Sequence, residues 1–162
     1  IDGVPEPFDG NLIHVATNGV MVRSKNEVIV ADILEKVVPG KWRYEVLLEG
    51  ADGKWCCPDF TISRSSGIPV YWEHLGMMNQ PSYVKRWHDK LRWYQDNGVA
   101  LAQDPEGRPL AEINDGPNGL LLWTDDAGGV NIPGWTELAR AVLEQSSASP
   151  ARRTGSKVAR PR

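Results

Sequence analysis

Three β-rich runs stand together in the middle of the chain, and their clustering limits the fold more than any other feature. The first two runs, residues 42–48 and 55–62, are joined by Gly50-Ala-Asp-Gly53, which is a hairpin signal. The third run spans residues 70–75 and follows a Ser-Ser-Gly turn. No helical segment separates the runs, so the regular strand–helix alternation of a doubly wound fold is not expected.

Helical signals flank this block on both sides. Residues 22–38 carry aliphatic side chains at helical spacing and stop at a Pro-Gly pair, and residues 81–97 start at a proline and end before a glycine. A late strand at 120–124 and a last helix at 134–144 follow. This order predicts an α/β fold in which helices flank a mixed central sheet.

Length and charge divide the chain into a body and two ends. The 162 residues suit one domain, which we place at 19–145. The Pro- and Gly-rich residues 1–18 are predicted to be a linker or boundary segment of a longer polypeptide. Residues 146–162 are predicted to be a disordered basic tail. Five of the 18 basic residues lie in this tail and no acidic residue does, so the rest carries a net charge of −8.

Composition excludes several classes of protein. Hydrophobic residues make up 41% of the chain, yet no apolar run approaches the roughly 18 residues of a membrane span, and no signal peptide opens the sequence. The two cysteines, Cys56 and Cys57, are too few for a disulfide scaffold or a cysteine-rich zinc module and are predicted to be buried. We expect a cytoplasmic protein of bacterial type with no membrane partner.

Two carboxylates lie at the starts of predicted elements. Glu27 stands at the mouth of the first helix, where Ser24 and Glu27 also fit a capping box, so a capping role and a functional role both remain open. Asp59 follows a proline at the entrance of a β-rich run, a position that by itself has little functional meaning.

A third carboxylate lies inside the strand at 70–75. Strand alternation places Glu73 on the same face as Tyr71 and Leu75, where a charge is costly unless something compensates it. The alternative is an edge strand with Glu73 at its solvated rim. On the following helix Lys90 belongs to an aromatic stripe, where a lysine is less ordinary than on a solvated face; the alternative is that it extends past the rings into water.

Convergence of these acids predicts a metal site. Carboxylates brought close together repel one another unless a cation lies between them, and all-oxygen ligation favours Mg²⁺ or Mn²⁺. Such a metal polarises a phosphoryl oxygen and lowers the pKa of an attacking water, and a nearby lysine offsets charge at phosphorus. The pattern therefore predicts phosphodiester hydrolysis.

The ordered set of motifs resembles the PD-(D/E)XK nuclease superfamily, which has the restriction-endonuclease-like fold. Over residues 22–143 the likeness is to nuclease domains attached to bacterial superfamily 1 DNA helicases. The segments that carry the resemblance are Arg23-Ser-Lys-Asn-Glu27, Tyr44-Glu45, Pro58-Asp59-Phe60, Tyr71-Trp-Glu-His-Leu-Gly76, and the helix with Tyr83, Trp87, Lys90-Leu91 and Trp93-Tyr94.

The resemblance implies roles for these residues. Asp59 and Glu73 would be metal ligands together with the main-chain carbonyl of His74, and Glu27 would act in the metal shell directly or through water. The superfamily pattern has a lysine two residues after the glutamate, but Leu75 stands there in this chain. We expect Lys90 to replace that lysine from the helix; the weaker candidates are Lys85 and Lys25.

The resemblance also implies a function and partners. We expect a Mg²⁺-dependent deoxyribonuclease that acts in DNA repair, recombination or processing, with DNA and a helicase portion of the same or another chain as partners. The predicted DNA contacts are Lys25, Tyr83, Trp87 and Tyr94. For Trp87 and Trp93 on the helix, core packing and stacking on unpaired bases both remain open. Two alternatives stand beside the nuclease: a catalytically inactive DNA-binding or helicase-docking module, and a small-molecule hydrolase.

Overall fold

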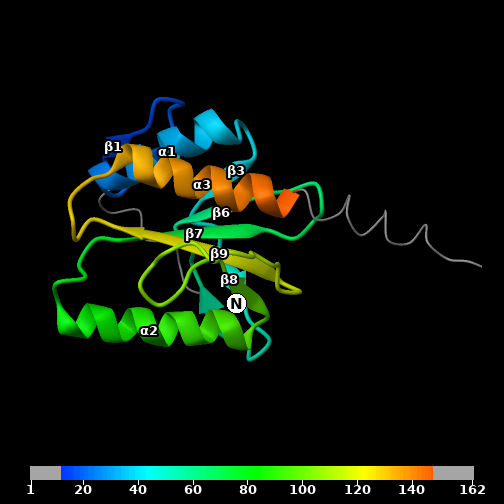
Figure 1. Ribbon diagram of the computed structural model, residues 1–162. Coiled ribbons are helices and arrows are strands. Elements are labelled where there is room, and N and C mark those ends of the chain that lie inside the picture. The colour runs from blue at the N-terminus through cyan, green and yellow to red at the C-terminus, as the bar shows by residue number, and fades with distance from the viewer. Residues whose placement is uncertain (1–11, 148–162) are drawn as a thin grey trace, which may run out of the picture.

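The structure is a computed structural model that describes residues 12–147 (Figure 1). Predictions for residues 1–11 and 148–162 lie outside this part of the chain. The elements, in order, are β1 (His14–Val15), β2 (Met21–Val22), α1 (Lys25–Val37), β3 (Trp42–Tyr44), β4 (Leu48–Glu49), β5 (Trp55–Cys56), β6 (Phe60–Ile62), β7 (Val70–Leu75), α2 (Pro81–Asp96), β8 (Val99–Leu101), β9 (Gly119–Asp125) and α3 (Ile132–Ser147).

A five-stranded mixed sheet organises the described residues. The strand order is β3-β6-β7-β9-β8, with antiparallel pairs up to β7 and parallel pairs from β7 onward. Helices α1 and α3 cover one face of this sheet and α2 covers the other (Figure 1). The prediction of an α/β fold with a mixed central sheet and flanking helices is therefore confirmed.

The central strand β7 separates two hydrophobic cores. All six of its residues are buried, and alternation sends them to opposite faces. Val70 and Trp72 pack with α1 and α3, whereas Tyr71 and Leu75 pack against α2. The solvated-rim alternative for this strand is wrong, because Glu73 lies inside the sheet and is only 3% exposed.

The helices follow the sequence pattern with shifted ends. Helix α1 starts at Lys25 rather than residue 22, because Val22 pairs with β1 and the Ser24 hydroxyl caps the helix by accepting the Glu27 N–H at 3.2 Å. Helix α2 starts at Pro81 as predicted, and α3 extends the predicted last helix at both ends.

Three short strands, β8, β1 and β2, were not predicted from the sequence. Strand β8 follows α2 after one turn and has only three residues, which is too short for a periodicity signal. Strands β1 and β2 form a hairpin, so residues 14–15 of the predicted boundary segment are paired with the domain. At the other end, Ser146 and Ser147 belong to α3 rather than to the tail.

The predicted central hairpin exists in two pieces. Its inner part pairs β4 with β5 in a separate two-stranded sheet, and its outer part pairs β3 with β6 in the main sheet. The break occurs at Glu45, a non-glycine residue with a positive φ of 52°. The Glu45 N–H donates to the Asp59 carbonyl at 2.9 Å, so this turn positions the residue at the entrance of β6.

No helix within residues 12–147 is long and apolar enough to cross a membrane.

Candidate active site

Asp59 and Glu73 meet where the β6–β7 ladder ends. The register pairs Phe60 with Trp72, so continuing it by one residue brings Asp59 opposite Glu73. The His74 main-chain N–H donates to Oδ2 of Asp59 at 2.8 Å. Burial raises the pKa of Asp59 well above its ordinary value, and the negative charges of Glu73 and Glu27 raise it further. Asp59 therefore lies within electrostatic reach of both other acids.

Helix α2 supplies a cation to Glu73. The Lys90 Nζ lies 2.7 Å from Oε2 of Glu73, and the Tyr94 hydroxyl donates to the same oxygen at 2.5 Å. Burial lowers the pKa of Lys90, but the charge and hydrogen bond of Glu73 outweigh it, so the pKa is raised above its ordinary value. The ammonium therefore stays charged at neutral pH and compensates the buried carboxylate.

Glu27 is held by a different pair of donors. Its Oε1 accepts from the Tyr44 hydroxyl at 2.9 Å and from the Arg23 main-chain N–H at 3.1 Å. Burial raises the pKa of Glu27, while these hydrogen bonds lower it; the raising effect prevails. The Arg23 guanidinium forms a bidentate ion pair with Glu45 at 2.7 and 2.9 Å. Glu27 thus lies at the cap of α1, and its functional role stays a prediction.

The side-chain hydrogen bonds of the three carboxylates use one named oxygen of each. Asp59 and Glu73 use Oδ2 and Oε2, and Glu27 uses Oε1. The buried side-chain atoms left without a partner in residues 12–147 are Thr61 Oγ1, Arg64 Nη1 and His74 Nε2. Carboxylate oxygens are the ligand type that suits Mg²⁺ or Mn²⁺.

The donor set fits a cation held by two side chains rather than three. Within the described residues no three or more Asp, Glu, His or Cys side chains are arranged to hold one metal ion together. Asp59, Glu73 and a main-chain carbonyl would make up such a two-side-chain set.

The main chain of His74 faces the same edge as Asp59. The N–H and C=O of one strand residue leave the strand on the same side, and the His74 N–H already donates to Asp59. Its carbonyl therefore leaves β7 on the same side as that N–H, toward β6. The imidazole lies on the opposite face of the sheet, with Nδ1 2.9 Å from Thr124 Oγ1 and the ring against Trp135. Only the main chain of His74 belongs to this site.

The two other lysine candidates do not reach the acids. The Lys85 ammonium lies 3.3 Å from Asp89 on the exposed face of α2. Lys25 is exposed at the start of α1 and forms no ion pair in the part of the chain that the structure describes. Of the three candidates, Lys90 alone contacts the cluster.

The predicted DNA contacts separate into two groups. Tyr83 is half-buried. The pKa of its hydroxyl is raised, mainly by burial and further by the negative charges of Asp59 and Glu73, against the opposing effect of a hydrogen bond from the Gly76 main chain. Lys25 is exposed. The prediction is wrong for Trp87 and Tyr94, because both side chains are buried against the sheet, 5% and 0% exposed. Neither offers a face to a nucleic acid.

The sequence did not reveal that two tyrosines, Tyr44 and Tyr94, hold the acids by hydrogen bonds. The segment Tyr44-Glu45 was part of the motif set without a role, yet Tyr44 fixes Glu27. The stripe on α2 placed Tyr94 near Lys90 but could not show that both reach the same oxygen of Glu73. Neither cysteine is fully buried; Cys56 Sγ lies 3.5 Å from the Tyr94 hydroxyl.

Comparison with known proteins adds little to this geometry. No protein-family model matches the chain. An uncharacterized protein of Methanocaldococcus jannaschii is 30% identical over 110 residues, which is 67% of this chain. The chain spans only 9% of the length of that protein. Its name states no activity, so the functional argument depends on the site itself.

Proposed function

We propose that this chain is a metal-dependent nuclease domain of the restriction-endonuclease-like fold that hydrolyses DNA phosphodiester bonds. The observation that carries the proposal is the 2.7 Å contact between Lys90 and Glu73 beside Asp59. The strand motif lacks its lysine, and a lysine on α2 supplies the charge at the same carboxylate. An ion pair at a buried carboxylate rarely adds stability over a well-packed apolar pair, so this pair favours a functional site over a purely structural one.

The oxygen donors support Mg²⁺ or Mn²⁺ as the cofactor. Asp59, Glu73 and the carbonyl of His74 would hold the metal, with Glu27 acting through water. A divalent ion at this position lowers the pKa of a bound water and polarises a phosphoryl oxygen.

The protein's own groups orient this chemistry. The Tyr94 hydroxyl and the Lys90 ammonium both hold Oε2 of Glu73. The ammonium also offsets the negative charge that develops on the phosphorus oxygens as water attacks and the leaving oxygen departs. Tyr44 holds Glu27 in the same way. Because these donors are fixed before substrate binds, little reorganisation is needed during the reaction.

The resemblance of the motif set makes a helicase portion of the same or another chain the proposed partner.

The nuclease activity is tested with the purified chain alone on plasmid, linear duplex and single-stranded DNA in Mg²⁺, Mn²⁺ and EDTA. We expect cleavage in either metal and none in EDTA. Binding without cleavage in both metals would contradict the nuclease and favour the inactive DNA-binding module, and hydrolysis of nucleotide diesters without DNA cleavage would favour the small-molecule hydrolase.

We expect Arg86 to contact a DNA phosphate at the mouth of the site. Its guanidinium lies 5.8 Å from the centre of the Tyr83 ring, and its side chain forms no hydrogen bond or ion pair within residues 12–147. Arg92, on the same helix, is instead paired with Asp89. Arg86→Ala should weaken DNA binding roughly three- to tenfold at low salt and reduce the salt slope by about 0.9 for duplex DNA.

Arg92→Ala is the matched control and should change DNA affinity by less than about twofold. Fluorescence anisotropy at several salt concentrations, in Ca²⁺ or EDTA to prevent cleavage, measures both variants. Equal effects of the two substitutions would show that Arg86 has no specific phosphate contact.

A further inference from the structure

A groove runs between the β4–β5 hairpin and helix α2. It has a volume of about 480 Å³, and the residues that line it include Lys54, Trp55 and Cys57 on one side and Lys90 and Trp93 on the other. Lys90 belongs both to this groove and to the acidic cluster, because its ammonium contacts Glu73. The groove therefore shares Lys90 with the proposed catalytic centre.

The two walls of the groove are held in place. The Ala51 N–H donates to Oδ1 of Asn97 at 2.7 Å, which ties the hairpin to the end of α2. A Cβ at Gly50 would lie 2.5 Å from Cζ2 of Trp93, so only glycine lets the hairpin pack this closely. The groove is thus a preformed feature of the fold.

Tryptophan exposure marks this groove among the surfaces of the described residues. Five of the seven tryptophans are buried, at 8% exposure or less: Trp42, Trp72, Trp87, Trp123 and Trp135. The two that remain partly exposed are Trp55 and Trp93, and both line the groove. An indole with a free face is a strong platform for stacking, and every nucleobase has a face to stack on it.

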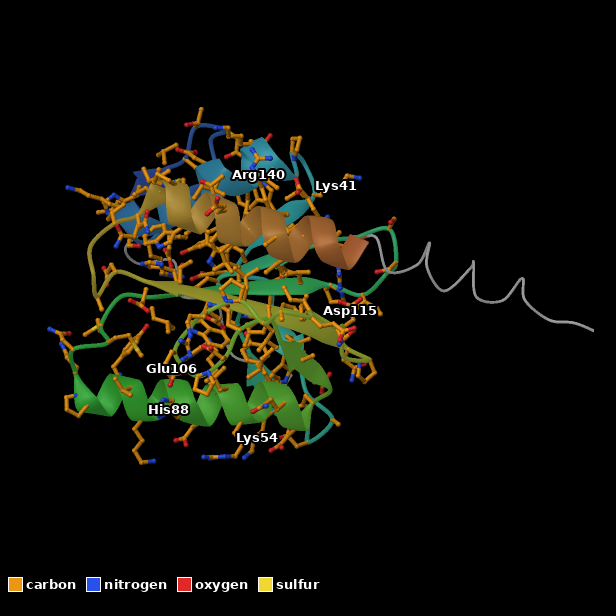
Figure 2. All side chains as sticks on the ribbon, in the orientation of Figure 1. Lys41, Lys54, His88, Glu106, Asp115 and Arg140 are labelled. Atoms are coloured by element: carbon orange, nitrogen blue, oxygen red, sulfur yellow. The ribbon has the colours of Figure 1, made fainter. Side chains whose placement is uncertain are left out.

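The charges of the groove suit a polynucleotide backbone. The Lys54 side chain is exposed and forms no ion pair in residues 12–147, whereas the Lys90 ammonium is already paired with Glu73. The one acid that lines the groove, Asp89, is paired with Lys85 and Arg92. Figure 2 shows Lys54 beside α2, while Lys41 lies near the other face of the sheet.

We propose that this groove binds an unpaired nucleobase of the DNA strand that is cut, by stacking on Trp55 and Trp93, with Lys54 on the adjacent phosphate. The inference rests on the proposed nuclease function and adds a preference for single-stranded DNA near the scissile bond. A base within a duplex is already stacked and paired, so it does not enter the groove.

Binding of an oligothymidylate to the full chain in EDTA tests the groove without cleavage. Single-stranded DNA should quench tryptophan fluorescence, and a duplex of equal length should bind more weakly. Trp55→Ala should weaken single-strand binding about tenfold or more, whereas Trp55→Phe should stay within about threefold, because a phenyl ring still stacks. Lys54→Ala should reduce the single-strand salt slope by about 0.7, and Lys41→Ala, as the control, should not change it.

Trp93→Ala is a second variant, but Trp93 also packs against the hairpin, so the Trp55 pair keeps the test independent of folding. The proposed role of the groove would be overturned if Trp55→Ala bound single-stranded DNA as tightly as the wild type does. It would also be overturned if the variant lost equal affinity for single-stranded and duplex DNA. Tryptophan-dependent single-strand binding without any cleavage would support the groove and overturn the nuclease. DNA cleavage together with an unchanged single-strand affinity in Trp55→Ala would support the nuclease and overturn the proposed role of the groove.

Discussion

The Asp59→Asn variant is expected to lose metal-dependent cleavage by about a thousandfold and, without metal, to be more stable than the wild type. The loss follows because a metal ligand supplies several kcal/mol of charge stabilisation, and each 1.4 kcal/mol is about tenfold in rate. The gain in stability follows because the charged form of Asp59 is unfavourable in the folded state. Burial is the main cause of its raised pKa, and the negative charges of Glu73 and Glu27 raise that pKa further. Asparagine removes the repelled charge and still accepts the hydrogen bond from the His74 N–H.

The stability gain should depend on pH in a defined direction. The pKa of Asp59 is higher in the folded state than the ordinary value of about 3.9. As pH rises from about 3.9 through the folded-state pKa, the unfolded chain loses its proton first, so the metal-free wild type loses stability. The Asn variant lacks this loss. The difference between the two proteins should be smallest below pH 4 and largest at neutral pH, at about 1 kcal/mol or more.

Chemical unfolding in EDTA between pH 3.5 and 8 measures this difference, and added Mg²⁺ should stabilise the wild type but not the variant. Asp96→Asn, at an exposed position of α2, is the control and should change neither activity nor stability. An Asp59→Asn variant that is fully active, or one that is less stable than the wild type at neutral pH, would contradict the metal-ligand role.

The Lys90→Met variant is expected to lose both activity and stability. Removing the ammonium leaves Glu73, which is 3% exposed, without its cation. Breaking a buried ion pair costs about 3–5 kcal/mol, and the one-third exposure of the Lys90 side chain reduces our expectation to about 2 kcal/mol. Loss of the charge near phosphorus should slow cleavage about a hundredfold or more at saturating metal.

A double variant separates these two effects. Adding Glu73→Gln to Lys90→Met removes the uncompensated charge, so stability should recover while cleavage stays lost. Lys85→Met, whose ammonium pairs with Asp89 at the surface of the same helix, should cost about 0.5 kcal/mol or less. Urea unfolding and cleavage rates measure all three proteins. Full activity in Lys90→Met would show that this lysine has no catalytic role.

The order of elements was predictable because it depends on local signals. Serine capping of α1, proline at the start of α2 and the continuous buried strand Val70–Leu75 are each visible in a few neighbouring residues. The break at Glu45 was not predictable, because a positive φ at a glutamate is sustained by contacts distant in sequence, namely the Asp59 carbonyl and the Arg23 guanidinium. A three-residue strand such as β8 carries too little pattern to be recognised.

The sequence by itself determined which residue types are available: three acids in the order of a nuclease motif, a lysine in an aromatic stripe, and an α/β succession of elements. Only the tertiary structure decided that Lys90 rather than Lys85 or Lys25 reaches Glu73, because that choice depends on how α2 crosses the sheet. It also decided that Trp87 is core while Trp93 lines a groove. Spacing along a helix shows which face of the helix a side chain lies on, but its burial depends on the segment that packs against that face. Trp87 packs against the sheet, whereas Trp93 packs against the β4–β5 hairpin.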